Sequence, residues 1–203
     1  MRYFLEDFEK THNKEWLFGA FPAWEYYPST GTHIGTDFKV VVGTSIFAPS
    51  DGEMFRIEYN QYKGNTGIFI FKHNGIEWGL ELCHLKEQPK KGEYREGEII
   101  AYSGNTGSAT TGAHLHAVLH RNATVTKHYL ELRSRADFLR LHSEGAVVDC
   151  FGWFCDNIKK PEQKSEDKET DASQKVIAIQ NNVDKKSLAE IIAKILRYFF
   201  PNN

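Results

Sequence analysis

Short runs of alternating apolar and polar residues, separated by turn residues, fill most of the chain between residues 39 and 120. Alternation with a period of two is the pattern of a strand that buries one face. Asn74-Gly75, between two apolar runs, is a strong hairpin signal. Serial short strands and turns favour a mainly β fold with an antiparallel sheet. The pattern predicts strands at residues 39–42, 45–48, 53–59, 68–71, 77–84, 98–102 and 114–120.

Helices are expected around this β region. Residues 1–14 have a mild helical pattern and predict a short helix or an arm on the core. Apolar residues at helical spacing predict a helix over residues 128–141, and the apolar residues 145–154 are expected to close the domain. The aromatic-rich residues 16–27 are expected to pack on the sheet, because large rings are mostly buried. The alternative is that some of these rings line a binding groove.

The C-terminal part has a different character. Residues 156–186 are largely charged and predict a linker after a domain spanning residues 1–155. Ser187-Leu188-Ala189-Glu190 forms a capping box, and the apolar spacing that follows predicts an amphipathic helix over residues 187–200. The expected role of its apolar face is docking on the domain or self-association. Contact with a cell envelope through Ser187–Phe200 is the alternative.

Charge and hydropathy argue against nucleic acid as a partner and against a transmembrane segment. The chain of 203 residues has a formal net charge of −2, which gives no electrostatic argument for binding nucleic acid. No apolar run approaches the roughly 18 residues of a transmembrane segment.

The chain has three cysteines. The pair Cys150 and Cys155 is open to two interpretations, a disulfide or two buried free thiols.

Two histidines in Gly112-Ala113-His114-Leu115-His116 provide the first candidate chemistry. Because side chains alternate along a strand, His114 and His116 point to the same face, roughly 6 to 7 Å apart. One of them can therefore bind a metal while the other stays close enough to handle a proton.

Further ligands lie upstream of this motif. His33 and Asp37 are an even number of residues apart and share a face in an extended segment. His84 stands at the end of an apolar run. Two histidines and one aspartate leave an open fourth position on a tetrahedral zinc, which is the arrangement of a catalytic site. The other histidines would then activate the bound water and stabilise the intermediate.

The order of the motifs carries a family resemblance. H-x-G-x-D at residues 33–37, then x-H-L ending at Leu85, then G-N-T-G-x-x-x-x-G-x-H-L-H at residues 104–116 resembles the lysostaphin-type (LytM-like) zinc metallopeptidases. This family cuts peptide bonds in bacterial cell-wall peptidoglycan. The likeness covers roughly residues 31–120, with a weaker echo at residues 148–153.

The resemblance implies a folded antiparallel sheet of the duplicated-hybrid-motif type, with the metal in a groove across one face. It also implies that residues 1–155 are a zinc metallopeptidase domain acting on peptidoglycan peptides. In that case Zn²⁺ is held by His33, Asp37 and His116, and His84 and His114 are the catalytic histidines. His12, His73, His120, His128 and His142 match no motif position and are interpreted as surface or packing residues.

Some positions depart from the family pattern. Leu82 stands where the family often has tyrosine, residues 117–119 lack the usual aromatic and acidic side chains, and Cys150 replaces a common proline. These departures bear on substrate detail more than on metal binding.

The biological setting is a separate expectation. Residues 1–7 include acidic side chains where a signal peptide needs an apolar run. Either the protein leaves the cell without a signal, as a phage lytic protein does, or a leader was removed before residue 1. The Met1 start favours the first, so we expect a phage or prophage lytic enzyme, released or virion-associated, that acts on the cell wall. The alternative is a non-enzymatic or virion-associated relative that serves as a wall-binding or assembly module.

Overall fold

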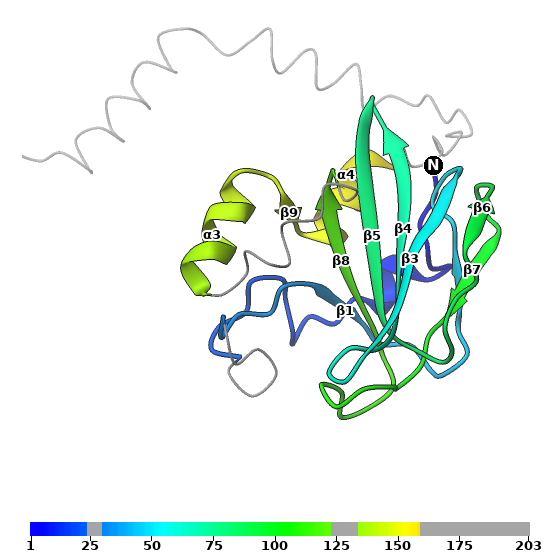
Figure 1. Ribbon diagram of the computed structural model, residues 1–203. Helices are drawn as coiled ribbons and strands as arrows, with labels where there is room; N and C mark the ends of the chain where they lie inside the picture. Colours follow the sequence, from blue (N-terminus) through cyan, green and yellow to red (C-terminus); the bar gives the residue numbers. More distant parts are fainter. Residues whose placement is uncertain (24–29, 123–133, 159–203) are drawn as a thin grey trace, which may run out of the picture. The chain divides into compact units, whose positions relative to one another are not determined.

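The computed structural model describes residues 1–23, 30–122 and 134–158, and shows a long twisted sheet with helices beside it (Figure 1). Its strands are β1 (Thr36–Phe38), β2 (Ser45–Phe47), β3 (Gly52–Asn60), β4 (Gly64–His73), β5 (Ile76–Leu85), β6 (Gly92–Tyr94), β7 (Ile99–Tyr102), β8 (Leu115–Arg121) and β9 (Val147–Val148). The helices are α1 (Phe8–Thr11), α3 (Arg135–Ser143) and α4 (Cys150–Asn157).

The described strands form a seven-stranded sheet and a smaller pair. The order in the large sheet is β1-β8-β5-β4-β3-β6, with β9 also paired to β8, while β2 and β7 pair with each other. All of these pairs are antiparallel. Strand β8, which begins within the H-x-H motif and contains His116, is hydrogen-bonded to β1 on one side and β5 on the other.

One face of the sheet buries the main core. On β8 the alternate residues Leu115, Ala117 and Leu119 belong to this core, as Leu80 and Leu82 of β5 do. Phenylalanines from both ends of the described chain, Phe4, Phe8 and Phe154, are part of the same cluster. Because side chains alternate, His116, Val118 and His120 point to the opposite face.

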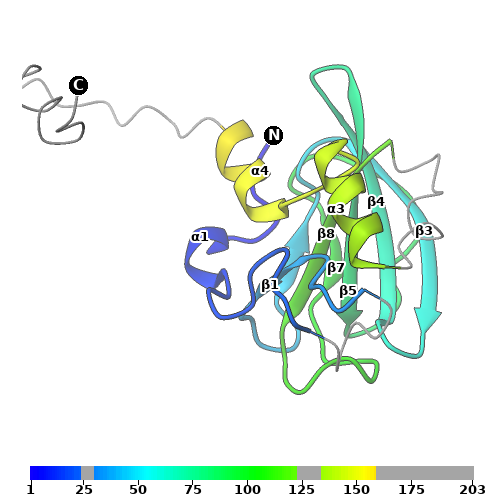
Figure 2. The same ribbon diagram turned by 90° about the vertical axis from the view of Figure 1, so that its left-hand side faces the viewer.

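Helices cover parts of both faces. On the core side α1 lies beside α4 (Figure 2), and the rings of Phe8 and Phe151 stack with centroids 5.4 Å apart. On the other side, Leu141 of α3 packs with Val118 and Val147. Helix α3 begins after Ser134, whose hydroxyl accepts a hydrogen bond from the Asp137 amide at 3.2 Å and caps the helix.

The predicted antiparallel β fold is confirmed, and several details are corrected. The strand predicted at residues 39–42 is wrong, because the pairing segment is β1, three residues earlier. Val41 and Val42 are 75% and 52% exposed, and the chain turns at Gly43, which has φ +90°. Residues 86–96, whose polar character predicts a loop, contain β6, which pairs with β3.

Other predictions fall partly beyond the described residues. The short N-terminal helix is α1. Helix α3 ends at Ser143, whereas residues 128–133 of the predicted helix lie outside the described part. Helix α4 runs to Asn157, two residues past the predicted boundary at 155. Residues 159–186 of the predicted linker and the whole predicted helix at 187–200 also lie outside it.

Two smaller observations complete the fold. Cys83, Cys150 and Cys155 form no disulfide, so the interpretation of Cys150 and Cys155 as a disulfide is wrong. In the described part of the chain, no helix has both the length and the apolar character needed to cross a membrane.

Candidate metal centre

The three predicted ligands converge where β1 meets β8. Asp37 lies directly opposite His116 in the antiparallel register, and His33 stands four residues before Asp37 in the segment that leads into β1. The His33 Nε2 atom lies 3.2 Å from His116 Nδ1 and 3.3 Å from Asp37 Oδ1. His116 Nδ1 lies 2.8 Å from the same carboxylate oxygen. Among the described residues this is the one group of histidine, cysteine and acidic side chains with such convergence.

The distances fit a small tetrahedral ion. Zinc bonds of about 2.0–2.2 Å to nitrogen and oxygen place neighbouring ligand atoms about 3.3 Å apart in a tetrahedron. The two separations that involve His33 Nε2 have this value within 0.1 Å. The third, between His116 Nδ1 and Asp37 Oδ1, is about 0.5 Å shorter, because these atoms form a hydrogen bond that an ion would replace. Two imidazoles and one carboxylate leave a fourth position for water or substrate, so the residues fit a catalytic zinc.

Backbone contacts orient these ligands. The Nδ1–H of His33 donates to the main-chain carbonyl of Leu17 at 3.0 Å, which leaves Nε2 as the atom that faces the centre. Gly35 lies against His116, and a Cβ at this position would collide with the imidazole ring. The hydroxyl of Thr36 donates to Asp149 at 3.0 Å, which ties β1 to the start of α4.

The charges at the site suit a cation. Burial alone would raise the pKa of Asp37, but hydrogen bonds from His116 and His33 outweigh it and hold that pKa well below its usual range. Burial lowers the pKa of His116, and the nearby Asp37 only partly opposes this effect. The site thus holds an ionised carboxylate and favours a neutral His116, which are the protonation states that bind metal.

The two predicted catalytic histidines lie beside this cluster. The ring centroids of His84 and His114 are 4.7 Å apart, and those of His84 and His116 are 6.1 Å apart. Simple alternation would put His84 on the core face with Leu80 and Leu82. A register irregularity in the β4–β5 pair and a left-handed backbone at His84, with φ +59°, turn the side chain to the other face. Such a backbone is uncommon for histidine and is typical of functional sites.

Both histidines are held in the same tautomer. The Nδ1–H of His84 donates to the carbonyl of Thr106 at 2.8 Å, and that of His114 donates to the carbonyl of Gly112 at 2.8 Å. Each neutral ring therefore has a lone pair at Nε2. Burial, followed by the neighbouring His116, lowers the pKa of His84 to about 4, so this ring is neutral near pH 7.

All five predicted residues line one cleft of about 230 Å³. The loop over residues 109–113 also lines this cleft, as do Asn13, Trp16 and Lys39. Trp16 makes an edge contact with His33, with centroids 5.7 Å apart, so this ring lines the groove. Phe18 instead packs on Phe138 of α3. The aromatic segment thus serves both roles that the sequence left open, and Trp24, Tyr26 and Tyr27 lie outside the described residues.

Sequence reasoning missed a charged cluster on the same face of the sheet. Glu81 is 1% exposed and lies 2.8 Å from the Lys63 ammonium and 3.6 Å from His120 Nε2. Burial alone would raise the pKa of Glu81, but Lys63 and His120 hold it well below its usual range. The sequence signal was a glutamate flanked by Leu80 and Leu82 in a largely apolar strand. His120 is a buried packing residue rather than a surface one.

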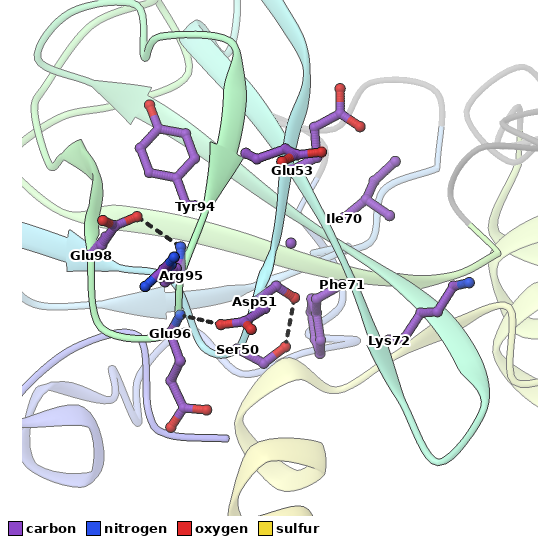
Figure 3. Close-up of a pocket in the computed structure, with 12 residues that line it drawn as sticks. Ser50, Asp51, Glu53, Ile70, Phe71, Lys72, Tyr94, Arg95, Glu96 and Glu98 are labelled. Atoms are coloured by element: carbon purple, nitrogen blue, oxygen red, sulfur yellow. Dashed lines mark hydrogen bonds between the residues drawn. The ribbon is translucent and has the colours of Figure 1, made fainter.

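A second, larger hollow has a different character (Figure 3). It has a volume of about 1010 Å³ and lies between β3, β4 and the segment around β6. Two of its carboxylates bind local backbone amides: Asp51 accepts a hydrogen bond from the Glu96 amide, and Glu98 accepts one from the Arg95 amide. Histidine and cysteine are absent from its lining residues, so it does not repeat the chemistry of the metal centre.

An open three-ligand centre beside two histidines, set on an antiparallel sheet, is the type of site found in metal-dependent hydrolases. The sequence places it in a family. Residues 31–127 match the model of peptidase family M23, so the chain contains a peptidase M23 domain. This match covers every metal-ligand and catalytic candidate from His33 to His116.

Relatives agree with this assignment. The chain is 40% identical over 101 residues to an uncharacterized metalloprotease of Haemophilus influenzae, covering 47% of this chain and 21% of the relative. It is 36% identical over 95 residues to the peptidoglycan DD-endopeptidase ShyC of Vibrio cholerae, covering 44% of this chain and 21% of the relative. The chain thus spans about a fifth of the length of these curated relatives.

A solved structure has the same fold. The antimicrobial peptidase lysostaphin from Staphylococcus simulans superposes with a TM-score of 0.50 and 18% identity, covering 84% of this chain and 61% of that one. At this identity the likeness supports the fold alone.

Proposed function

We propose that this protein is a zinc-dependent endopeptidase that hydrolyses peptide bonds in bacterial peptidoglycan. The observation that carries the proposal is the convergence of His33 Nε2, Asp37 Oδ1 and His116 Nδ1, with His84 and His114 beside them. The M23 domain supports the reaction class, and relatives such as the Vibrio cholerae peptidoglycan DD-endopeptidase support the substrate class.

The roles follow from the geometry of each side chain. His33, Asp37 and His116 would hold the zinc, which when bound supplies a water of lowered pKa and a Lewis acid for the scissile carbonyl. The strand register of β1 and β8 sets two of the ligands directly opposite each other, and the Leu17 carbonyl fixes the third. The wall of residues 109–113 and the ring of Trp16 would hold the substrate peptide between them.

The tautomers of His84 and His114 define how a proton moves. In each neutral ring Nδ1 carries the proton and donates a hydrogen bond to a backbone carbonyl. The Nε2 atom therefore has a lone pair, which can accept a proton but cannot donate one. One ring accepts the proton of the attacking water. A ring that carries protons on both nitrogens can donate from Nε2 to the developing oxyanion or to the leaving amine.

The test separates metal binding from catalysis. We would measure zinc per chain and release of soluble peptides from purified peptidoglycan for wild type, His116→Ala, His84→Ala and His73→Ala. His73 lies away from the centre, 3.1 Å from Asn157, and serves as the matched control. We expect stoichiometric zinc and cleavage in wild type and His73→Ala, loss of both in His116→Ala, and zinc without cleavage in His84→Ala.

Two outcomes would count against the proposal. A wild-type protein without zinc would overturn the metal centre. Zinc without cleavage of any type of peptidoglycan would favour the non-enzymatic alternative. The phage-borne or virion-associated setting and self-association through Ser187–Phe200 stay predictions, which a search of virions for the protein and a size measurement after deletion of residues 187–203 would test.

A further inference from the structure

Lys39 stands at the mouth of the metal-centre cleft. Along the extended segment that includes β1, Thr36 and Phe38 are buried, whereas Asp37 and Lys39 both line the cleft, as alternation requires. The amide of Lys39 donates to the carbonyl of Thr11 at 2.6 Å, which fixes the backbone from which its side chain projects.

The charges of the cleft single out this side chain. Among the described residues that line the cleft, Lys39 is the one lysine or arginine. The loop over residues 109–113, which also lines the cleft, consists of alanine, threonine and glycine and has no charge. The acidic side chain in the lining is Asp37, which belongs to the ligand set. A negative group on a bound peptide would therefore find its attractive partner at Lys39.

The present partner of Lys39 is easily exchanged. Its ammonium lies 3.0 Å from Glu15, and the two side chains are 56% and 78% exposed. Ion pairs of this kind contribute little, because water and salt screen them. Glu15 is outside the cleft lining, so the lysine can turn from it to a ligand without uncovering a buried charge.

We propose that Lys39 is a specificity-determining residue that binds a free carboxylate of the substrate peptide close to the scissile bond. This inference rests on the proposed endopeptidase function and narrows its substrate class. The favoured peptides carry a free acid next to the cleavage site, and peptides with a neutral group at that place are poorer substrates.

A matched pair of peptides tests the inference. Two cross-linked muropeptides would differ only in the carboxyl group beside the scissile bond, which is free in one and amidated in the other. For wild type we expect a kcat/KM ratio of free to amidated peptide of about five, the factor that an exposed ion pair of about 1 kcal/mol gives. The preference should lie in KM, because binding rather than chemistry is changed.

Variants assign the preference to one side chain. Lys39→Gln should bring the ratio to about one, and Lys39→Arg should keep it. Lys10→Gln is the control, because Lys10 forms a similar exposed pair with Asp7 at 2.9 Å and does not line the cleft. Glu15→Gln, which releases Lys39 from its partner, should raise the ratio or leave it unchanged.

The outcomes separate this inference from the proposed function. A wild-type ratio of one, a ratio unchanged in Lys39→Gln, or an equal loss on both peptides would overturn the role of Lys39. If wild type cleaves neither these peptides nor whole peptidoglycan, the proposed endopeptidase function itself fails, and the inference fails with it. Calorimetry with the zinc-loaded His84→Ala variant, which does not turn the peptides over, should give the same ratio as a difference in Kd between the two peptides.

Discussion

The Nδ1 atom of His33 lies 3.0 Å from the main-chain carbonyl oxygen of Leu17, so a segment that precedes the family match orients a proposed metal ligand. The contact is part of a short two-way pairing. The Gly19 amide donates to the His33 carbonyl at 2.8 Å, and the His33 amide donates to the Ala20 carbonyl at 3.0 Å. This N-terminal arm, residues 11–20, thus acts as an outer shell of the metal centre.

Loosening the arm should weaken zinc binding. Gly19 has φ +76° and a donating amide, and proline provides neither. We expect Gly19→Pro to lower zinc affinity roughly 10- to 100-fold, the range seen when outer-shell partners of metal ligands are removed. Competition titration with a chromogenic chelator measures this change.

The matched control for this prediction is Gly43→Pro. Gly43 also has a left-handed backbone, with φ +90°, and its amide donates to the Ser103 carbonyl at 2.8 Å, but it contacts no ligand. Its zinc affinity should stay within about twofold of wild type, by the same outer-shell reasoning. Equal losses in the two variants would show that the arm has no specific part in the centre.

Catalysis should be separable from metal binding at Gly107. This residue has φ +88° and lies against the backbone of Tyr62 and Gly64, where a Cβ has no room. Gly107→Ala would push the loop away and carry the neighbouring Thr106 carbonyl from His84. We expect kcat to fall roughly 100-fold, as misplacing a catalytic group by about 1 Å does, with zinc content unchanged.

Gly75→Ala tests whether backbone strain alone causes such a loss. Gly75 has a similar φ of +74° and open space around it. The variant should therefore carry a comparable strain while kcat stays at the wild-type value. A loss of zinc in Gly107→Ala, or a similar fall of kcat in both variants, would contradict the role assigned to the Thr106 contact.

Removing the partner of a buried carboxylate should destabilise the fold. Glu81 is 1% exposed, whereas Lys63 is 34% exposed. We expect Lys63→Met to lower the free energy of unfolding by about 2 to 3 kcal/mol, less than the usual 3–5 kcal/mol because water still reaches Lys63. Urea unfolding at pH 7 measures this, with Lys10→Met at an exposed pair as the control, expected within about 0.5 kcal/mol of wild type.

The same pair predicts a pH dependence. Lys63 and His120 hold the pKa of Glu81 below its ordinary value of 4.5, so the folded state binds fewer protons at this carboxyl group than the unfolded state does. This contribution to stability is therefore present above about pH 4.5 and is lost as the pH falls further. In Lys63→Met the carboxyl group protonates more easily, so the difference between wild type and variant should shrink toward pH 4. A difference that grows on acidification would be inconsistent with this cluster.

The grouping of the proposed metal ligands could be predicted from the sequence, because it follows from the alternation of side chains along an extended segment. Alternation alone puts His114 and His116 on one face, and the even spacing of His33 and Asp37 does the same. His84 breaks that rule, because its position depends on a register irregularity and a left-handed backbone, which a single apolar run does not reveal. The motif resemblance identified the residue, but the reason for its orientation came only from the structure.

Long-range contacts explain the other differences. The strand expected at residues 39–42 has three consecutive valines and is more apolar than β1, and only the pairing with β8 shows that β1 is the strand. The contacts of Lys63 with Glu81, and of Leu17 with His33, join residues 18 and 16 positions apart. No periodicity encodes such pairs, so neither the charged cluster nor the arm could be predicted.

The core phenylalanines described above set the breakpoints at which this domain can be recombined with others. Phe4, Phe8 and Phe154 are fully or almost fully buried, and all three lie outside the matched residues 31–127. A graft limited to the matched segment would leave the sheet without these rings and the metal centre without its arm. Chimeras should therefore exchange residues 1–158 as one block, and the proposed peptide specificity would be transferred with that block.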